Sequence, residues 1–238
     1  MSVVRTALAW TAAAAATPVF AGAVVLARRG SPSAVGPHRI ARGWASLLLR
    51  SAGVSVTVSG APPDAALGPV VLMSNHVSSL DIPVLLSVLD PATRTGFLAK
   101  RSLFRLPFLG GAMDALGCIS VDREELGSAP GMLAEALAAL RSGRSLLVFP
   151  EGTWSDGAAL LPLRRGGFLL ALRAGVAIAP LAVEGSQRVL PGGGRLLRPG
   201  PVVVRWGHPV PTRGLGVSQL PGLVDEVRTA IESLRRAS

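Results

Sequence analysis

The sequence predicts an α/β protein with a largely parallel sheet and helices on both faces, preceded by an N-terminal pair of membrane-associated helices. Two observations support this. From residue 53 onward, short apolar runs bounded by turn residues alternate with helical patterns, which is typical of a parallel sheet covered on both sides. Before residue 53, an uncharged run is followed by a basic amphipathic segment. We therefore expect membrane-anchoring or interfacial helices over 1–52 and an α/β domain over 53–238.

The first N-terminal segment carries no charge from Thr6 to Ala27 and ends at Arg28 and Arg29. It is long enough to cross a bilayer, which takes roughly 20 residues, and Pro18 is expected to interrupt it. The basic residues that follow place the bulk of the protein on the cytoplasmic face of the cell membrane. A cleaved signal peptide is the competing interpretation, because Arg5 resembles an n-region and 21–23 a cleavage site. The apolar run continues to the double arginine, which favours an anchor.

The second N-terminal segment, 38–50, is predicted to be an amphipathic helix with a basic polar side. Its apolar residues recur at helical spacing, at Ile40, Trp44, Leu47 and Leu48. Such a helix suits an anionic membrane interface. The pattern equally fits an ordinary helix packed on the domain.

The remaining elements follow from apolar runs, caps and glycines. Strands are expected over 53–58, 69–73, 95–99, 118–121, 145–149, 176–183 and 202–206. Helices are expected over 80–86, 129–141, 167–174 and 218–236. Ser78 or Ser79 is expected to cap the first of these helices, Ser128 to cap the second and Gly143 to end it.

Composition narrows the set of partners. The formal net charge is +10, almost all from arginine, with Lys100 as the sole lysine. This excess suits anionic lipid, nucleic acid or a phosphorylated substrate, but the few aromatic residues offer no base-stacking platform, so no nucleic-acid partner is expected. The single Cys118 excludes an internal disulfide, and the scattered His38, His76 and His208 show no ligand spacing, so no metal is expected.

His76 and Asp81 carry the clearest chemical signal. A histidine oriented by a carboxylate is a general base near neutral pH. Five residues separate the pair, so a regular helix or strand would point the two side chains apart. They meet only if the chain turns between them, as at the end of the strand 69–73 and the start of the helix 80–86. Pro83 is tolerable there because it falls in the first turn.

Four separated pieces resemble the glycerolipid acyltransferases of the 1-acylglycerol-3-phosphate acyltransferase (PlsC) type. They are Asn-His-x-x-x-x-Asp at 75–81, Gly-x-Ile-x-x-x-Arg at 117–123, Phe-Pro-Glu-Gly-Thr at 149–153 and Ile-Ala-Pro-Leu-Ala at 178–182. The resemblance covers about 69–212. It implies transfer of a fatty acyl group from acyl-CoA or acyl-carrier protein to a lysophospholipid hydroxyl, giving phosphatidic acid when the acceptor is 1-acylglycerol-3-phosphate.

The resemblance also implies roles for individual residues. His76 is the expected base and Asp81 its orienting carboxylate, and no further cofactor is needed. Acceptor binding is expected from Asn75, Lys100, Arg123, Glu151, Gly152, Thr153, Arg164 and Arg165. For Asn75, a turn-forming role is an equal alternative. Arg123 suits a phosphate because a guanidinium donates paired N–H bonds to its oxygens.

Trp154 departs from the family pattern, where many members have arginine after the threonine. This leaves the acceptor open to another or a non-phosphate head group. Two other classes of protein stay as alternatives. A lipid hydrolase would use Ser74, Ser78 or Ser79 as nucleophile, but no Gly-x-Ser-x-Gly surrounds them. A non-catalytic lipid-binding protein would not need the intact His76 and Asp81.

Overall fold

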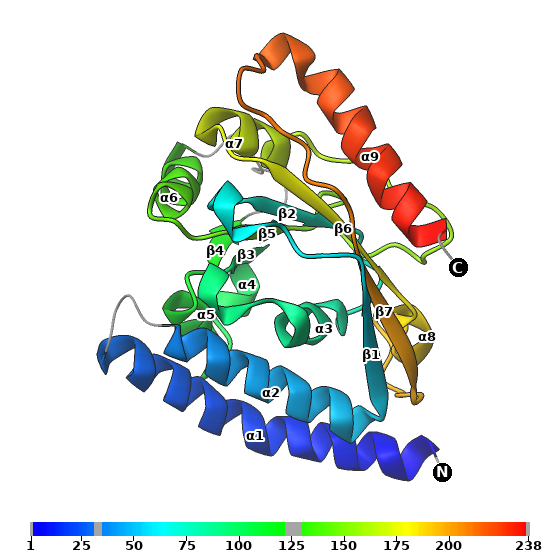
Figure 1. Cartoon of the computed structure of the whole chain (residues 1–238). Helices are drawn as coiled ribbons and strands as arrows, with labels where there is room; N and C mark the ends of the chain where they lie inside the picture. Colours follow the sequence, from blue (N-terminus) through cyan, green and yellow to red (C-terminus); the bar gives the residue numbers. More distant parts are fainter. Residues whose placement is uncertain (1, 31–34, 122–129, 237–238) are drawn as a thin grey trace.

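The computed structural model describes residues 2–30, 35–121 and 130–236, and in these residues a seven-stranded sheet forms the centre of the molecule (Figure 1). The strand order is β1-β7-β6-β2-β5-β3-β4, and every neighbouring pair is parallel except β6 and β7. The predicted, largely parallel sheet is therefore confirmed. The strands are β1 (Val54–Ser59), β2 (Val71–Ser74), β3 (Gly96–Lys100), β4 (Ile119–Val121), β5 (Leu146–Val148), β6 (Ile178–Glu184) and β7 (Gly200–Trp206).

Helices cover both faces of the sheet. On one side lie α6 (Pro130–Arg141), α7 (Gly166–Ala174) and α9 (Leu220–Arg236). On the other lie α3 (Asp81–Val88), α4 (Arg101–Phe104) and α5 (Leu109–Ala115), with α1 (Ser2–Gly30) and α2 (Gly36–Ala52) outside them (Figure 1). The short α8 (Ser186–Val189) follows β6, and one-turn 3-10 helices span Ala65–Leu67, Pro91–Thr93 and Val217–Gln219.

The central strands divide their side chains between two cores because successive residues of a strand point to opposite faces. In β2, Val71 and Met73 join the core beneath α6, α7 and α9, while Leu72 joins the core beneath α2 and α3. Leu146 and Leu147 of β5 divide in the same way. All five are at most 2% exposed. This two-sided burial explains why these strands are uninterrupted apolar runs in the sequence.

Two details of the expected elements need correction. Neither Ser78 nor Ser79 is the residue that precedes α3; Leu80 holds that position and makes no side-chain cap. Ser78 instead closes the turn before the helix, since its Oγ accepts from the Leu80 amide at 3.1 Å. Pro83 is the third residue of α3, in the first turn as expected. The expected cap Ser128 lies outside the described residues.

The two N-terminal helices run side by side and in opposite directions against the α/β body. α1 continues through Pro18, so the expected interruption is wrong. It is attached to the body near its start, where Trp10 Nε1 donates to the Arg195 carbonyl at 2.8 Å and Thr6 Oγ1 accepts from the Leu197 amide at 3.1 Å. The division into domains at 52/53 stays a prediction, because residues of both helices contribute to the main apolar core.

α2 is a packed helix rather than one with a free apolar face. Its buried positions are Ala41, Ala45, Leu49 and Ala52, with Pro37 at its start. Small side chains on this face allow close approach to the body. Of the predicted apolar stripe, only Leu47 is classed as exposed, at 37%. The structure thus favours the second of the two interpretations of 38–50.

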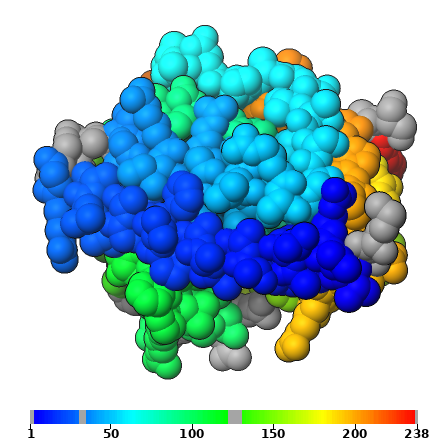
Figure 2. All heavy atoms as spheres, turned by 90° about the horizontal axis from the view of Figure 1, so that it is seen from below, coloured from blue at the N-terminus to red at the C-terminus, as the bar shows by residue number. Residues whose placement is uncertain are grey.

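The free apolar surface belongs to α1 instead. Val4, Leu8, Val19 and Leu26 recur on one side of this helix and are 66–70% exposed, as expected for residues whose helical angles fall within about 60° of one another. α1 lies lengthwise across this face of the molecule (Figure 2). By length and composition, the stretch Val3–Gly30 is also apolar enough to cross a membrane. A contiguous apolar stripe of this kind marks an interaction surface.

Candidate active site

His76 and Asp81 meet at the carboxyl end of β2, where the chain turns before α3. His76 Nδ1 lies 2.8 Å from Asp81 Oδ2. The Asp81 side chain is fully buried and that of His76 is 14% exposed. The turn predicted from their spacing is therefore what brings them together. The carboxyl end of a strand in an α/β sheet is also the usual position of a ligand site.

Asp81 is held by donors on both carboxylate oxygens. Oδ2 accepts from the backbone amides of Val77 and Ser78 at 2.8 and 2.9 Å, in addition to the histidine. Oδ1 accepts from Ser186 Oγ at 2.5 Å. With this carboxylate acting as acceptor, the neutral ring of His76 carries its proton on Nδ1, and Nε2 is then a hydrogen-bond acceptor. Nothing in the sequence near 76–81 indicates Ser186, which lies at the start of α8.

Asn75 fastens β2 to β6. Its side-chain amide donates to the Val183 carbonyl at 2.9 Å, and its oxygen accepts from the Val183 amide at 2.8 Å. Asn75 is 1% exposed. Both polar groups of the side chain are thus occupied by backbone, which favours an orienting role over the expected contact with an acceptor.

Glu151 connects the loop after β5 to the base. Its Oε1 accepts from the His76 amide at 2.8 Å, and its Oε2 accepts from the Leu161 amide at 2.9 Å. The Ser155 amide donates to the His76 carbonyl at 2.8 Å. Glu151 is 3% exposed. The buried carboxylate therefore braces the backbone on which His76 stands, which is a positioning role that the motif alone did not specify.

Two aromatic side chains flank the His76 ring. Phe149 stacks on it with ring centroids 3.9 Å apart and an interplanar angle of 15°. Trp154 lies edge-on to the same ring, with ring centroids 5.9 Å apart, and its side chain is 42% exposed. These contacts limit the rotation of the imidazole. Trp154 also places an exposed apolar surface next to the base.

The expected basic residues occupy different positions around the site. Lys100 is exposed at the carboxyl end of β3, two strands from β2 and therefore about 10 Å away across the sheet. Arg164 lies over Gly152, where φ is 69° and an added Cβ would come within 2.5 Å of the Arg164 Nε. Its amide also donates to the Pro150 carbonyl at 2.8 Å.

For the other expected residues, the structure gives only a place in the fold, or they lie outside the described residues. Arg165 is exposed at the start of α7. Thr153 is half-buried in the loop after Gly152. Arg123 lies outside the described residues, two positions beyond the end of β4. Of the two neighbouring arginines, Arg164 is thus the one that the structure brings to the Glu151 loop.

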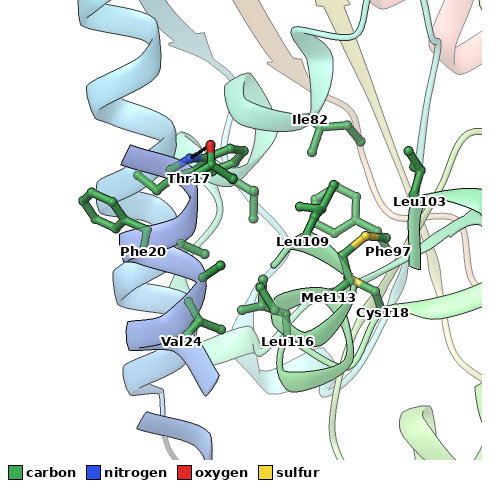
Figure 3. Close-up of a pocket in the computed structure, with 15 residues that line it drawn as sticks. Thr17, Phe20, Val24, Ile82, Phe97, Leu103, Leu109, Met113, Leu116 and Cys118 are labelled. Atoms are coloured by element: carbon green, nitrogen blue, oxygen red, sulfur yellow. Dashed lines mark hydrogen bonds between the residues drawn. The ribbon is translucent and has the colours of Figure 1, made fainter. Parts of the chain in front are cut away.

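An apolar cavity of about 120 Å³ lies between the α1–α2 pair and the body (Figure 3). Ile82 and Leu86 of α3 line it, so it begins one residue after Asp81 along that helix. Its few polar groups are satisfied, since Trp44 Nε1 donates to Thr17 Oγ1 at 3.1 Å. The other side chains in contact with it come from α1, α2, β3, α4, α5 and the segment between α5 and β4: Phe20, Ala21, Val24, Ala41, Phe97, Leu103, Leu109, Ala112, Met113, Leu116 and Cys118.

The Cys118 thiol belongs to this apolar surface. It is buried, and burial raises its pKa to about 11, so it stays protonated at neutral pH. Within 2–30, 35–121 and 130–236, no group of three or more histidine, cysteine, aspartate or glutamate side chains is arranged to hold a metal ion.

A largely parallel sheet has a hydrogen-bonded histidine–aspartate pair at its carboxyl edge and an apolar cavity beside the helix that follows. This arrangement is of the kind found in α/β enzymes. A family model described as Acyltransferase matches residues 55–184. The chain therefore belongs to the acyltransferase family.

Relatives in this family act on lysolipids according to their names. The human 1-acyl-sn-glycerol-3-phosphate acyltransferase alpha is 36% identical over 185 residues, which are 77% of this chain and 65% of that protein. The lyso-ornithine lipid O-acyltransferase of Pseudomonas aeruginosa is 34% identical over 201 residues, 77% of this chain and 74% of that protein. This chain thus spans just under two thirds of the length of the human relative.

The fold is also that of a solved member of the family. The crystal structure of the 1-acyl-sn-glycerophosphate acyltransferase PlsC from Thermotoga maritima matches with a TM-score of 0.80 and 25% sequence identity. The match covers 100% of this chain and 97% of that one. The N-terminal helices are therefore part of the shared architecture.

Proposed function

We propose that the protein is a membrane-associated lysolipid acyltransferase, with 1-acylglycerol-3-phosphate as the first candidate acceptor and phosphatidic acid as its product. The observation that carries the proposal is the His76–Asp81 pair, with Nδ1 bound to the buried carboxylate and Nε2 left to accept a proton. The donor is acyl-CoA or acyl-carrier protein. No cofactor beyond this donor is required.

In the proposed reaction, His76 Nε2 takes the proton of the acceptor hydroxyl as its oxygen attacks the thioester carbonyl carbon. The tetrahedral intermediate then collapses, the C–S bond breaks, and the imidazolium returns the proton to the leaving thiolate. Such a base contributes roughly 10²- to 10⁴-fold in rate. Asp81 stabilises the imidazolium, while Phe149 and Glu151 hold the ring and its backbone.

The apolar cavity is the proposed site for the fatty acyl chain. Its walls are almost wholly hydrocarbon, and α3 connects it to the catalytic pair. Ala112 and Met113 are 6% and 8% exposed on its α5 wall. Ala112→Leu should shift the preferred donor to a shorter chain, and Met113→Ala should permit a longer one. The preferred acyl-chain length of each variant is measured by mass spectrometry of the product. If both variants shifted this length in the same direction, the assignment of the cavity would be contradicted.

The exposed stripe of α1 is the proposed membrane-contacting surface. The opposite side of α1 is bonded to the body at Thr6 and Trp10 and packs through Val24 on α5. A helix attached at both ends in this way is suited to lying along the bilayer with one face buried. In this proposal, Arg28 and Arg29 near its end meet the anionic head groups of the cytoplasmic face of the cell membrane.

A second acceptor is favoured by Trp154. An arginine at this position would offer a phosphate contact, whereas the indole offers an apolar surface 5.9 Å from the His76 ring. A lysolipid with a non-phosphate head group fits that surface better, and the Pseudomonas relative is named for lyso-ornithine lipid. Trp154→Arg should therefore raise kcat/KM for 1-acylglycerol-3-phosphate relative to lyso-ornithine lipid.

The deciding experiment uses detergent micelles that contain one lysolipid at a time and a labelled acyl donor. Acylation by the wild type that is lost in folded His76→Ala supports the proposal. Release of free fatty acid from lipid alone would indicate a hydrolase. Lipid binding without turnover in either form would indicate a non-catalytic protein. The lysolipid that is acylated fastest identifies the acceptor.

A further inference from the structure

A cluster of basic side chains lies at the amino-terminal edge of the sheet, opposite the candidate active site. Arg94 precedes β3 and Arg144 precedes β5, whereas His76 follows β2. Arg94 Nη2 donates to the carbonyls of Ser142 and Gly143 at 3.2 and 3.4 Å. Arg144 Nε donates to Ser142 Oγ at 3.4 Å. The two guanidinium groups are thus fixed against one turn.

Two more basic residues approach the same corner from the N-terminal helices. The Arg144 guanidinium covers Gly117, since an added Cβ there would collide with it. Val24 of α1 and Ile40 of α2 pack with Leu116 in one apolar cluster. Arg28 lies one turn beyond Val24, and its charge acts on Arg144. His38 is close enough to the same corner for the Leu116 backbone and all three arginines to act on its ring.

The positive charge of this cluster is not neutralised by an ion pair within the part of the chain that the structure describes. No ion pair joins Arg28, His38, Arg94 or Arg144 to an acid among the described residues, and Glu135 is the one carboxylate whose charge acts on Arg144. All four side chains are half-buried. Half-buried like charges repel more strongly than exposed ones, because water screens them less.

Burial and the neighbouring charges together lower the pKa values of two members. Burial, and then the charges of Arg28 and Arg94, lower the pKa of Arg144. Burial first, and then Arg144, Arg94 and Arg28, lower the pKa of His38 to about 4, against a smaller opposing effect of the Leu116 backbone. The Leu116 backbone lies near the ring but does not meet hydrogen-bond geometry, so neither ring nitrogen of His38 has a hydrogen-bond partner among the described residues, although both are shielded from solvent.

The first turn of α2 adds to the positive potential. The helix begins at Gly36, and Val35 before it makes no side-chain hydrogen bond to the first turn. His38 stands in that turn, so the free backbone N–H groups and the helix dipole act at the same place as the three arginines. A bound anion would relieve the repulsion and supply hydrogen-bond acceptors to these donors.

We propose that Arg28, His38, Arg94 and Arg144 form a binding site for a phosphate group, separate from the catalytic centre. Guanidinium groups bind phosphate through paired N–H bonds. The phosphate is supplied either by the head group of an anionic membrane lipid or by a free phosphate. The site lies beside the end of the apolar α1 stripe at Leu26, where a lipid head group would be found. The proposal does not depend on acyl transfer.

The test is isothermal titration calorimetry of the full chain in neutral detergent at about 0.15 M salt, without acyl donor. One titrant is the same micelle containing phosphatidylglycerol, and the other is inorganic phosphate. The site variant is Arg28→Gln/Arg144→Gln. The matched control is Arg29→Gln/Arg39→Gln, which removes two exposed charges next to the site.

If the site binds the lipid head group, the site variant should bind phosphatidylglycerol roughly 30-fold more weakly than the wild type. Each removed charge contributes about fivefold. The control variant should change this binding by less than about threefold, because exposed side chains that are not held against the head group are screened by salt and contribute little. Weakened binding of inorganic phosphate as well, in the site variant alone, would identify free phosphate as the source. Equal losses in both variants, or no binding of either titrant, would overturn the proposal.

A single substitution covers the case in which the site variant fails to fold. Arg28→Gln removes a side chain that makes no hydrogen bond among the described residues, so the helix should persist. It should still weaken binding about fivefold, and Arg29→Gln should not. Circular dichroism and Tm without titrant verify that each variant is folded.

Discussion

Asp81→Asn separates the charge of the carboxylate from its geometry. In the structure, Oδ2 accepts from His76 Nδ1 and from the amides of Val77 and Ser78, so an oxygen atom is required there. Oδ1 meets only Ser186 Oγ among the described residues, and a hydroxyl can accept as well as donate. Asparagine should therefore place its oxygen at Oδ2 and its amide toward Ser186, which keeps the histidine tautomer and removes only the charge.

The size of the effect follows from the ion pair that forms in the transition state. Opposite unit charges about 4 Å apart attract by roughly 4 kcal/mol at an effective dielectric constant of 20, which corresponds to about 10³-fold in rate. The imidazolium is only partly formed at that point. We therefore expect Asp81→Asn to lower kcat by about 10²- to 10³-fold, with little change in KM.

Asp81→Ala provides the comparison, because it removes both charge and geometry. It leaves two buried backbone amides without an acceptor, at roughly 1–3 kcal/mol each, and frees the His76 ring. Activity should fall at least about tenfold below that of Asp81→Asn, with a lower Tm. Turnover in micelles gives the rates, and thermal unfolding gives the stabilities. Equal activity of the two variants, or near-wild-type activity of Asp81→Asn, would refute this division of roles.

The remaining predictions concern the support of the site, the membrane surface and pH. Ser186→Ala should lower kcat by roughly 10-fold or more, since a hydrogen bond to a charged group contributes about 1.5–3 kcal/mol. Ser186→Thr keeps the hydroxyl and should restore kcat. Ser74→Ala is the control, because it removes a buried hydroxyl that has no partner among the described residues, and it should leave kcat unchanged. Val19→Glu, on the exposed stripe of α1, should weaken vesicle binding about tenfold without changing Tm; unchanged co-sedimentation would contradict the proposed membrane surface. Because burial lowers the pKa of His38 from 6.5 to about 4, the unfolded chain binds a proton in this range that the folded chain does not. The free energy of unfolding in phosphate-free buffer should therefore fall as pH drops from 6.5 to 4, by up to ~1.4 kcal/mol per pH unit, and His38→Gln should flatten this slope in chemical denaturation curves.

Patterns in the sequence were sufficient to predict those features of the structure whose residues lie within one short segment of the chain. The apolar runs of β2, β5 and β6 predicted the sheet because both faces of these strands are covered, and the spacing of His76 and Asp81 predicted a turn because no regular element joins them. The Phe-Pro-Glu-Gly-Thr motif identified Glu151. Its bond to the His76 amide spans 75 positions, so the motif did not specify what the carboxylate does.

The sequence by itself determined the α/β class and the family, because each depends on short runs of residues that can be recognised one at a time along the chain. Only the tertiary structure decided that Ser186 holds Asp81, that Asn75 is occupied by β6, and that the free apolar face belongs to α1 rather than α2. The physical reason is that these features depend on which strands and helices become neighbours. Ser186 and Asp81 lie 105 positions apart along the chain, and Asn75 and Val183 lie 108 positions apart. Packing alone brings each pair into hydrogen-bond distance.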